Sequence, residues 1–301
     1  MRVAAIDCGT NSIRLLIADG TEGRLTDVAR RMEIVRLGEG VDRTGRLAPE
    51  AIERTRRALL AYATEIDASG VTRVRMVATS ASRDASNAAD FRHMVRGVLG
   101  ADPEVISGDE EARLSFTGAV RGLSADPPYL VVDIGGGSTE FVTGRSDIAA
   151  ALSVDIGCVR MTERHLRGDP PTAVEIAAAE RDSTAAVDRA LAAVGGRDAR
   201  TLVGLAGSVT TVTALALGLP GYDADRIHHA RVGYDAVAKV TADLLAATVA
   251  QRRALPVMHP GRADVIGAGA LILRIVMERS GQAAVVASEH DILDGICYGL
   301  V

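Results

Sequence analysis

Cysteine is scarce in this sequence, with three residues among 301, at positions 8, 158 and 297. The number is odd, the positions are widely scattered and no Cys-x-x-Cys pair occurs, which argues against a disulfide framework and against a zinc site. We therefore expect Cys8, Cys158 and Cys297 to be small buried thiols.

Long apolar runs are also lacking. The longest, residues 265–273, is far too short to cross a bilayer. Near the N-terminus, Asp7 interrupts the apolar segment 3–6, so the sequence lacks the features of a signal peptide. These absences predict a cytoplasmic protein with no membrane partner.

Lysine is almost absent, since Lys239 is the only one and the other basic residues are arginine. Together with the abundant alanine, this indicates a compositional bias of the genome rather than an adaptation to phosphate. The formal net charge is −5, which argues against a broad nucleic-acid-binding surface but leaves room for a local basic cleft. We expect no nucleic-acid partner.

Two common nucleotide-binding motifs are missing, namely the Gly-x-x-x-x-Gly-Lys-[Ser/Thr] loop and a Gly-x-Gly-x-x-Gly loop that opens a helix. The chain instead carries two similar glycine loops, Asp7-Cys-Gly-Thr-Asn-Ser12 and Asp133-Ile-Gly-Gly-Gly-Ser-Thr-Glu140. Each follows one strand-like segment and precedes another, which predicts a β-hairpin turn rather than a strand-to-helix turn. Either loop alone is compatible with a plain tight turn, but their repetition in the same context favours a function.

The composition of both loops suits a phosphate chain gripped from two sides. Glycine allows tight turns that bring backbone N–H groups close to an anion. Further hydrogen-bond donors could come from Thr10, Asn11, Ser12, Ser138 and Thr139. Asp7 and Asp133 would repel phosphate directly, so we expect them to face a divalent cation or the water shell of that cation. The loops therefore imply magnesium.

Length and composition allow two ordinary domains, because the chain has 301 residues and 48% of them are hydrophobic. The first half predicts strands near 2–7, 12–18, 24–36, 73–78 and 104–106, with helices from Pro49, after Asn87 and over 109–122. The second half predicts strands near 129–133, 139–143, 149–157 and 201–205, helices near 172–194 and a largely helical tail after 208. Asp126-Pro-Pro128 is the predicted seam, because proline pairs stop regular structure. We therefore predict an α/β duplication with domains over 1–124 and 125–301.

A third glycine site, Ala206-Gly207-Ser208, lies between the predicted strand 201–205 and a predicted helix over 209–217. A helix N-terminus with small residues favours an anion, because its free N–H groups and the positive end of its dipole lie there. Ser208 could equally do no more than cap its helix. The residues alone leave both interpretations open.

Glu111 lies in the first turn of the helix predicted near 109–122, in the segment Ser107-Gly-Asp-Glu-Glu-Ala-Arg113. Acidic residues commonly complement the helix dipole at this position, which is sufficient to explain Asp109 and Glu110. Near two phosphate loops, the Glu111 carboxylate could instead hold an attacking water and take its proton.

Arg83 lies in the segment Thr79-Ser-Ala-Ser-Arg-Asp-Ala85, which follows the predicted strand 73–78. That placement predicts a strand-end loop, where ligands gather in α/β proteins, and arginine offers a planar fork that matches phosphate oxygens. An ion pair between Arg83 and Asp84 is the alternative. No role is assigned to His228, His229 and His259, because no third candidate metal ligand lies at a suitable spacing from them.

Five segments, taken in order along the chain, strongly resemble the exopolyphosphatase and guanosine pentaphosphate phosphohydrolase (Ppx/GppA) family. They are the two hairpin loops, the segments 79–85 and 106–113, and Arg262-Ala-Asp-Val-Ile266. The family belongs to the superfamily of actin, sugar kinases and heat-shock chaperone ATPases. The resemblance therefore implies a duplicated ribonuclease-H-like fold with two domains and an inter-domain cleft that binds phosphates.

The resemblance also implies hydrolysis of a terminal phosphoanhydride, from inorganic polyphosphate or guanosine pentaphosphate, with release of orthophosphate. The position that matches the family's catalytic base is Glu111, and Asp7 would support metal-bound waters. The positions that match its metal and phosphate contacts are Asp133, Glu140, Asn11, Ser12, Arg83, Gly135, Gly136, Gly137, Ser138, Gly207 and Ser208. The implied ion is Mg²⁺ or Mn²⁺, with room for a monovalent cation. Relatives often pair, which implies a homodimer.

The sequence departs from the family pattern in places. Its length resembles that of the short members without C-terminal helical domains, which favours short-chain polyphosphate or a nucleotide over long polymers. Thr10 stands where serine is frequent. Asp291-Ile-Leu-Asp-Gly295 replaces an expected Gly-Leu-Arg-Glu-Gly. This leaves open how the last helix docks and whether it forms a dimer contact. In some members of the superfamily the last helix folds back onto the first domain.

Two other functions fit the same residues. A non-hydrolytic sensor would bind alarmone or polyphosphate tightly and release no phosphate. A phosphotransferase like the sugar kinases would need an acceptor pocket, and Glu111 as a base suits a hydroxyl group as well as water. Hydrolysis is the favoured prediction.

Overall fold

The computed structural model describes residues 1–301. The chain forms two compact units, the first made of Met1–Gly118 and Asp291–Val301 and the second of Ala119–His290. The division lies within helix α5 (Gly108–Val120), before the predicted domain boundary at residue 124, and the chain returns to the first unit at Asp291. The first unit is therefore discontinuous in sequence.

The first unit is built on a five-stranded mixed sheet in the order β3-β2-β1-β4-β5. Its strands are β1 (Arg2–Cys8), β2 (Ser12–Thr21), β3 (Arg24–Ile34), β4 (Arg73–Ala78) and β5 (Glu104–Val105). Besides α5, its helices are α1 (Val41–Thr44), α2 (Pro49–Ala68), α3 (Ser80–Asp84), α4 (Ala88–Leu99) and α13 (Ile292–Tyr298). β1 pairs antiparallel with β2 and parallel with β4.

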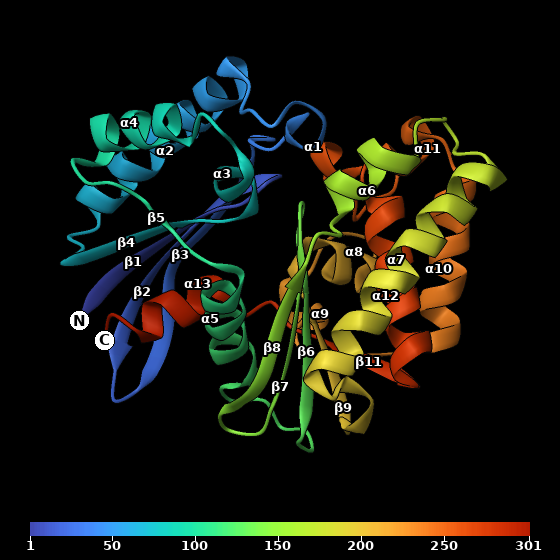
Figure 1. The fold of residues 1–301 in the computed structure, drawn as a ribbon. Helices are drawn as coiled ribbons and strands as arrows, with labels where there is room; N and C mark the ends of the chain where they lie inside the picture. Colours follow the sequence, from blue (N-terminus) through green and yellow to red (C-terminus); the bar gives the residue numbers. More distant parts are fainter. The chain divides into compact units, whose positions relative to one another are not determined.

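Strand β1 is buried on both faces because helices cover both sides of its sheet. Successive side chains of a strand point to opposite faces. Ala4 and Ile6 therefore pack in the cluster formed with α2 and α4, and Val3 and Ala5 pack in the cluster formed with α5 and α13. Figure 1 shows α2 and α4 on one side of this sheet and α5 and α13 on the other. The last helix of the chain thus covers its first strand.

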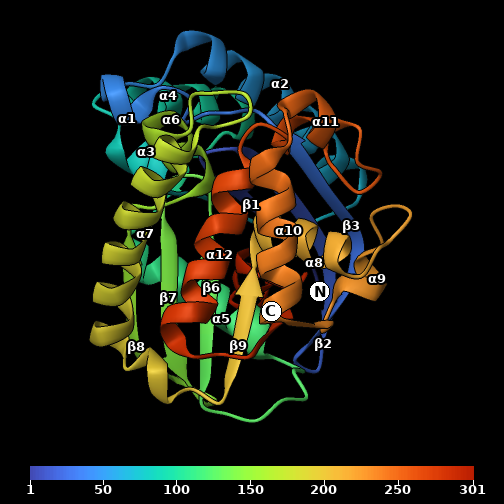
Figure 2. The same ribbon diagram turned by 90° about the vertical axis from the view of Figure 1, so that its right-hand side faces the viewer.

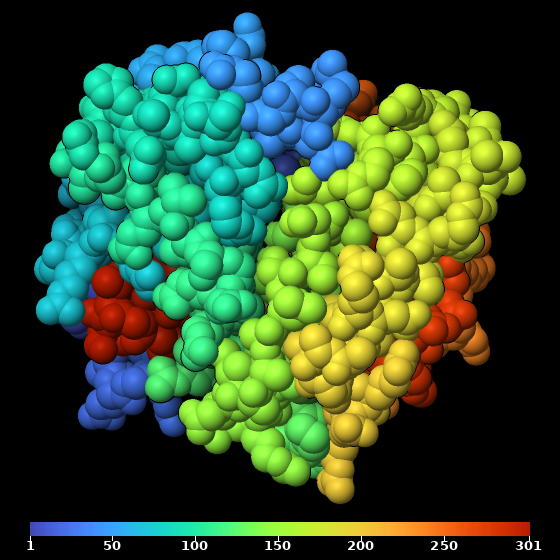
Figure 3. Space-filling view, in the orientation of Figure 1, coloured from blue at the N-terminus to red at the C-terminus, as the bar shows by residue number.

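Helix α13 crosses α5 where two glycines meet backbone atoms. A Cβ atom on Gly295 would overlap the carbonyl group of Leu114, and one on Gly118 would overlap the carbonyl group of Asp291. The absence of a side chain lets the two helix backbones approach this closely. Figure 3 shows the red C-terminal segment lying among blue and teal atoms of the first unit. The Asp291–Gly295 segment, which departs from the family pattern, is thus part of the surface through which α13 docks.

We expect Gly295→Ala to lower the free energy of unfolding by about 1–3 kcal/mol, the usual cost of overpacking. The added methyl group would meet a backbone carbonyl, which cannot rotate away as a side chain can. Chemical denaturation followed by far-UV circular dichroism measures the change. Gly299→Ala is the matched control, because a Cβ there would lie 3.4 Å from the nearest carbonyl oxygen. Equal stability of the two variants would contradict the close crossing.

The second unit is built on a six-stranded mixed sheet in the order β10-β11-β9-β6-β7-β8. Its strands are β6 (Tyr129–Ile134), β7 (Thr139–Gly144), β8 (Ile148–Val154), β9 (Thr201–Leu205), β10 (Arg231–Gly233) and β11 (Ala284–Ala287). Its helices are α6 (Cys158–His165), α7 (Ala173–Val194), α8 (Ala206–Ala216), α9 (Ala224–Ile227), α10 (Tyr234–Ala246), α11 (Val249–Arg253) and α12 (Ile266–Ser280), with short 3₁₀ turns at Gly196–Asp198 and Pro260–Arg262.

The two sheets share one pattern of connections. In each, the first three strands form an antiparallel meander, and the fourth strand pairs parallel with the first. The order β8-β7-β6-β9-β11 in the second unit repeats β3-β2-β1-β4-β5 in the first, and β10 is added at one edge. The predicted α/β duplication is therefore present in the backbone.

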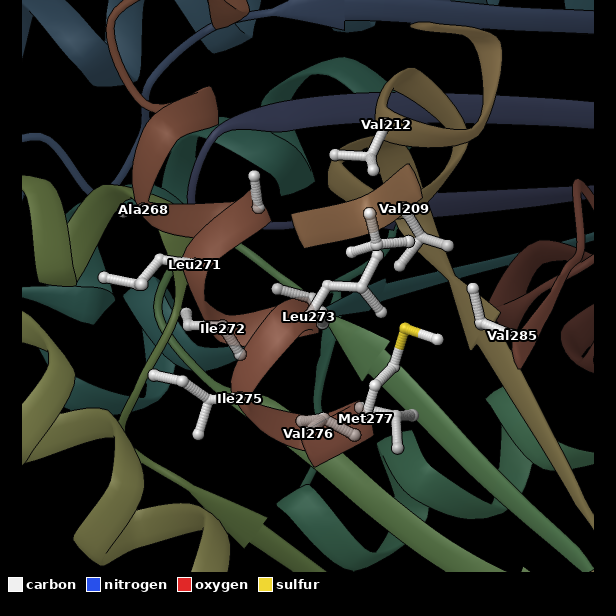
Figure 4. Packing of buried hydrophobic residues seen from close by; sticks show 14 of the residues in the cluster. Val209, Val212, Ala268, Leu271, Ile272, Leu273, Ile275, Val276, Met277 and Val285 are labelled. Atoms are coloured by element: carbon white, nitrogen blue, oxygen red, sulfur yellow. The ribbon is translucent and has the colours of Figure 1, made fainter. Parts of the chain in front are cut away.

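Helix α12 lies in the core of the second unit. Figure 2 shows α7, α10 and α12 over one face of the sheet, and Figure 4 shows Leu273 and Met277 directed toward Val209 of α8 and Val285 of β11. A helix that is apolar nearly all round needs such a buried position. This packing explains the longest apolar run of the sequence, and no helix of the chain is both long and apolar enough to span a membrane.

Most local predictions are confirmed, but two short strands were not predicted. All three cysteines are free and buried, as expected. The region after residue 208 is largely helical, as predicted, and it also contains the strands β10 and β11. β11 is a short apolar segment, and such a segment cannot be assigned to strand or helix by periodicity alone. Its parallel pairing with β9 is a tertiary contact that makes it a strand.

Candidate active site

The hairpin loop between β1 and β2 is closed by a hydrogen bond from Gly9 N to Ser12 O at 2.9 Å. Thr10 is buried, and its hydroxyl shares a hydrogen bond of 2.7 Å with the hydroxyl of Ser80. Its side chain therefore supports the loop from inside the unit. The Oδ1 atom of Asn11 is buried without a hydrogen-bond partner, so this amide group has unused capacity at the loop.

Asp7 lies at the end of β1, directly opposite Arg14 of β2. Its Oδ2 atom accepts hydrogen bonds from Arg14 Nε at 3.1 Å and Nη2 at 2.7 Å, and Arg14 Nη1 also contacts the carboxylate of Asp291. Burial raises the pKa of Asp7, and the Arg14 charge opposes that rise. The Asp7 Oδ1 atom is buried and has no hydrogen-bond partner. One oxygen is thus fixed by arginine and the other remains available to a water or an ion.

Glu111 and Arg83 lie together in the first unit. Arg83 is on α3, so the predicted loop is in fact one short helix directly after β4. Its Nη1 atom donates to the carbonyl oxygen of Ile106 at 2.9 Å and to Glu111 Oε2 at 3.3 Å. Glu111 is in the first turn of α5, and its side chain is 12% exposed. The neighbouring Glu110 contacts Arg75 instead, at 3.4 Å, so the two acidic side chains have different partners.

The second hairpin loop places two carboxylates side by side. Gly135 N donates to Ser138 O at 3.1 Å, which closes the turn between β6 and β7. Asp133 and Glu140 lie directly opposite each other on these strands, so their side chains are on the same face. Both residues are buried, and Ser153 of β8 donates a hydrogen bond of 2.8 Å to Glu140 Oε1. Two buried carboxylates in this arrangement favour a bound cation.

The donor set at Asp133 and Glu140 fits Mg²⁺ better than a metal that needs a full protein cage. The chain contains no group of three or more His, Cys, Asp or Glu side chains arranged to hold a metal. Mg²⁺ is commonly bound through one or two carboxylates, with waters and substrate phosphates completing its coordination.

Two predicted hydroxyl donors of the second loop differ in their surroundings. Thr139 is fully buried and its Oγ1 donates to the carbonyl oxygen of Ile156 at 2.5 Å, so its hydroxyl holds the loop within the unit. Ser138 is nearly as buried, at 1% exposed, and its carbonyl oxygen closes the turn. A direct contact between the Ser138 hydroxyl and phosphate stays a prediction.

The third glycine site lies at the N-terminus of α8. Leu205 pairs with Asp133 in register, so Gly207 and Ser208 follow the strand that neighbours β6. The guanidinium group of Arg262 lies against Gly207, where any Cβ atom would overlap it, and its Nη1 donates to Thr211 Oγ1 at 2.9 Å. Sequence reasoning did not assign Arg262 a role, although its segment 262–266 was one of the five that carried the resemblance. The site gains a positive charge from it.

Comparison with known proteins identifies relatives of this chain. Residues 16–301 match the model of the Ppx/GppA phosphatase family. The chain is also 53% identical to Exopolyphosphatase 2 of Mycobacterium tuberculosis over 99% of this chain and 98% of that protein. The chain belongs to the Ppx/GppA phosphatase family. The predicted family membership is confirmed.

Solved structures of Ppx/GppA relatives share the fold. The crystal structure of an exopolyphosphatase-like protein matches with a TM-score of 0.96 and 43% identity, covering 99% of this chain and 97% of the other. The Aquifex aeolicus member of the Ppx/GppA family matches with a TM-score of 0.84 and 32% identity, covering 100% and 97%. These likenesses confirm the predicted duplicated ribonuclease-H-like, actin-like two-domain fold class.

The structure distributes the predicted site residues of this Ppx/GppA protein over its two units. The first unit contains Asp7, Thr10, Asn11, Ser12, Arg83 and Glu111, and the second contains Asp133, Gly135, Gly136, Gly137, Ser138, Thr139, Glu140, Gly207 and Ser208. Within the first unit Arg83 meets Glu111, and within the second Asp133 meets Glu140 in register. Their roles in catalysis remain predictions.

Proposed function

We propose that this chain is an exopolyphosphatase, which releases the terminal orthophosphate of inorganic polyphosphate. The observation that carries the proposal is the identity of 53% with Exopolyphosphatase 2 over nearly the whole of both chains. The two carboxylate sites described above support it, because one suits a general base and the other suits a cation. Guanosine pentaphosphate has the same terminal phosphoanhydride and is a second candidate substrate.

In the proposed reaction Glu111 orients a water molecule and takes its proton as the water oxygen attacks the terminal phosphorus. The bond to the bridging oxygen breaks, and that oxygen keeps the electron pair. Arg83 is already tied to Glu111 at 3.3 Å and presents a guanidinium group that can bind a phosphoryl oxygen. The backbone N–H groups of the glycine loops would stabilise charge on the phosphate oxygens.

The proposed resident ion is Mg²⁺, or Mn²⁺ in its place, held by Asp133 and Glu140. Asp7 would act through a water molecule, because Arg14 already binds one of its oxygens. A bound divalent ion would neutralise charge on the terminal phosphates. Gly207, Ser208 and Arg262 would receive a further phosphate group at the N-terminus of α8.

The homodimer predicted from the family stays a proposal, which the molecular mass in solution tests.

The deciding experiment is orthophosphate release by the purified protein with Mg²⁺, with short-chain polyphosphate, long-chain polyphosphate and guanosine pentaphosphate offered in parallel. We expect release from polyphosphate, loss of that release with EDTA, and its return when Mg²⁺ is added in excess. The three rates rank the substrates. Binding of polyphosphate without any phosphate release would overturn the hydrolase and favour a sensor of the same fold.

A further inference from the structure

The N-terminus of α6 holds the glycine loop of the second unit through its carbonyl oxygens. Three successive carbonyl groups of the loop accept hydrogen bonds from the first residues of this helix. The bonds run from Cys158 N to Gly135 O at 2.9 Å, from Val159 N and Arg160 N to Gly136 O at 2.9 and 3.1 Å, and from Arg160 Nε to Gly137 O at 2.7 Å. The first three donors are N–H groups that a helix N-terminus leaves without intrahelical partners.

These bonds fix where the loop N–H groups point. A peptide unit is planar and trans, so its C=O and its N–H point in opposite directions. Each carbonyl group that faces α6 therefore directs the N–H group of the next residue away from α6. The N–H groups of Gly136, Gly137 and Ser138 lie on that opposite side, and no acceptor in the chain binds them. Successive N–H groups on one side of a turn form a concavity that binds anions.

The close approach of α6 to the loop depends on Gly157. A Cβ atom at this position would lie 2.6 Å from Gly137 N and would also overlap the carbonyl group of Gly136. A side chain there would push the helix away from the loop. The backbone of Gly157 is extended, a conformation that any residue can adopt. Glycine is therefore needed here because a side chain would collide with the loop, and not because of its backbone dihedral angles.

The first unit contains a similar arrangement at the equivalent place. Val35 N and Arg36 N donate to Asn11 O at 3.1 and 2.8 Å, and Gly38 N donates to Thr10 O at 2.9 Å. In both units the donors come from the segment that follows the third strand of the sheet. The duplication therefore includes the support of each loop. In the second unit a side chain, that of Arg160, joins the backbone donors.

We propose that Arg160 is a positioning residue for the phosphate loop of the second unit, an inference that rests on the proposed phosphatase function. Its Nε–H group holds the carbonyl of Gly137, and this directs the N–H of Ser138 toward the phosphate. Arg160 acts here as a hydrogen-bond donor of fixed geometry rather than as a charge that attracts the anion. Misplacement of a binding group by about 1 Å can lower a rate by about 10²-fold.

Two substitutions separate the hydrogen bond from the charge. In Arg160→Gln the side-chain amide nitrogen is the same number of bonds from Cα as the arginine Nε, so the donor stays and the charge is lost. In Arg160→Lys the charge stays, but a methylene group replaces the donor. We expect kcat/KM for polyphosphate to fall by about 10–100-fold in Arg160→Lys and to fall clearly less in Arg160→Gln. The affinity for inorganic phosphate, measured by calorimetry, should follow the same order.

Arg197→Met is the matched control, because Arg197 also donates its Nε–H to a backbone carbonyl, that of Arg279 at 3.2 Å, away from the loop. We expect it to retain the wild-type kcat/KM. Thermal unfolding curves confirm that the variants are folded at the assay temperature. A lysine variant as active as the glutamine variant, or as active as wild type, overturns the proposal. If the wild type hydrolyses no polyphosphate, the proposed function fails, whereas the order of phosphate affinities still tests the role of Arg160.

Discussion

Glu111→Gln is expected to lower kcat for polyphosphate hydrolysis by about 10²–10⁴-fold, the usual contribution of a general base. Glutamine has nearly the shape of glutamate and can still accept a hydrogen bond from Arg83, which contacts Glu111 at 3.3 Å. It cannot take a proton from the attacking water. Substrate affinity should therefore change little while turnover is lost. Phosphate release and polyphosphate binding, measured on the same preparation, provide both quantities.

Glu110→Gln is the matched control for this variant. Glu110 is in the same turn of α5, but its carboxylate contacts Arg75 at 3.4 Å instead of Arg83 and is 40% exposed. Its replacement should leave kcat close to that of the wild type. A parallel loss of binding and turnover in Glu111→Gln would contradict its role as the base, and so would equal losses in the two variants.

Arg14→Met is expected to lower the free energy of unfolding by about 3–5 kcal/mol at neutral pH, the usual cost of removing one partner from a buried ion pair. Arg14 contacts both Asp7 and Asp291, and these two carboxylates are 5% and 4% exposed. Methionine retains most of the apolar stem of arginine and removes only the charged group. The two buried carboxylates would then lose their shared counter-charge. Chemical denaturation of the variant and the wild type measures the difference.

The loss in Arg14→Met should depend on pH. Burial raises the pKa of Asp7 above its ordinary value of 3.8, and the Arg14 charge opposes this rise. In the variant the pKa of Asp7 should rise further, so the folded state holds the proton more tightly than the unfolded state. Ionised Asp7 then destabilises the fold above the folded pKa, and this penalty disappears below 3.8. The stability difference from wild type should therefore grow as the pH rises from about 4 to 7.

The chain offers a close control for Arg14 at the other end of the same strand pair. Arg2 of β1 faces Asp19 of β2 in register, as Asp7 faces Arg14, and its Nη2 contacts Asp19 Oδ2 at 2.8 Å. These side chains are 36% and 42% exposed. Solvent screens exposed ion pairs, so they contribute little to stability. Arg2→Met should therefore cost much less than Arg14→Met, and a similar loss in both variants would show that burial is not the cause.

The hairpins and their loops could be predicted from sequence because their signals are local. Apolar alternation, an aspartate and glycines within a few residues are sufficient to predict β1, β2, β6 and β7 and the turns between them. The pairing of Arg83 with Glu111 could not be predicted in the same way. The two residues lie on separate helices and meet only because α3 and α5 both follow strands of one sheet.

The hydrogen bonds that hold the glycine loops in place could not be predicted from the sequence either. Arg160 has no motif around it that connects it with Gly137, and their hydrogen bond exists only because α6 packs against the turn. The segment Asp291–Gly295 was recognised as unusual, but its partner Arg14 is far away in the sequence. Asp294 similarly binds Arg30 of β3, with an Nη2 to Oδ1 distance of 2.8 Å. Such contacts depend on the tertiary structure and leave no periodic pattern.

The position of α13 has a consequence for synthesis of the chain on the ribosome. β1 is made first, whereas α13, which together with α5 covers Val3 and Ala5, is made only after the whole of the second unit. At about 5–20 residues per second, the apolar face of the new sheet therefore waits many seconds for its cover. The second unit can fold during this interval. A chain that ends before residue 291 would lack α13 on this face, so residues 291–301 decide whether the core of the first unit is completed.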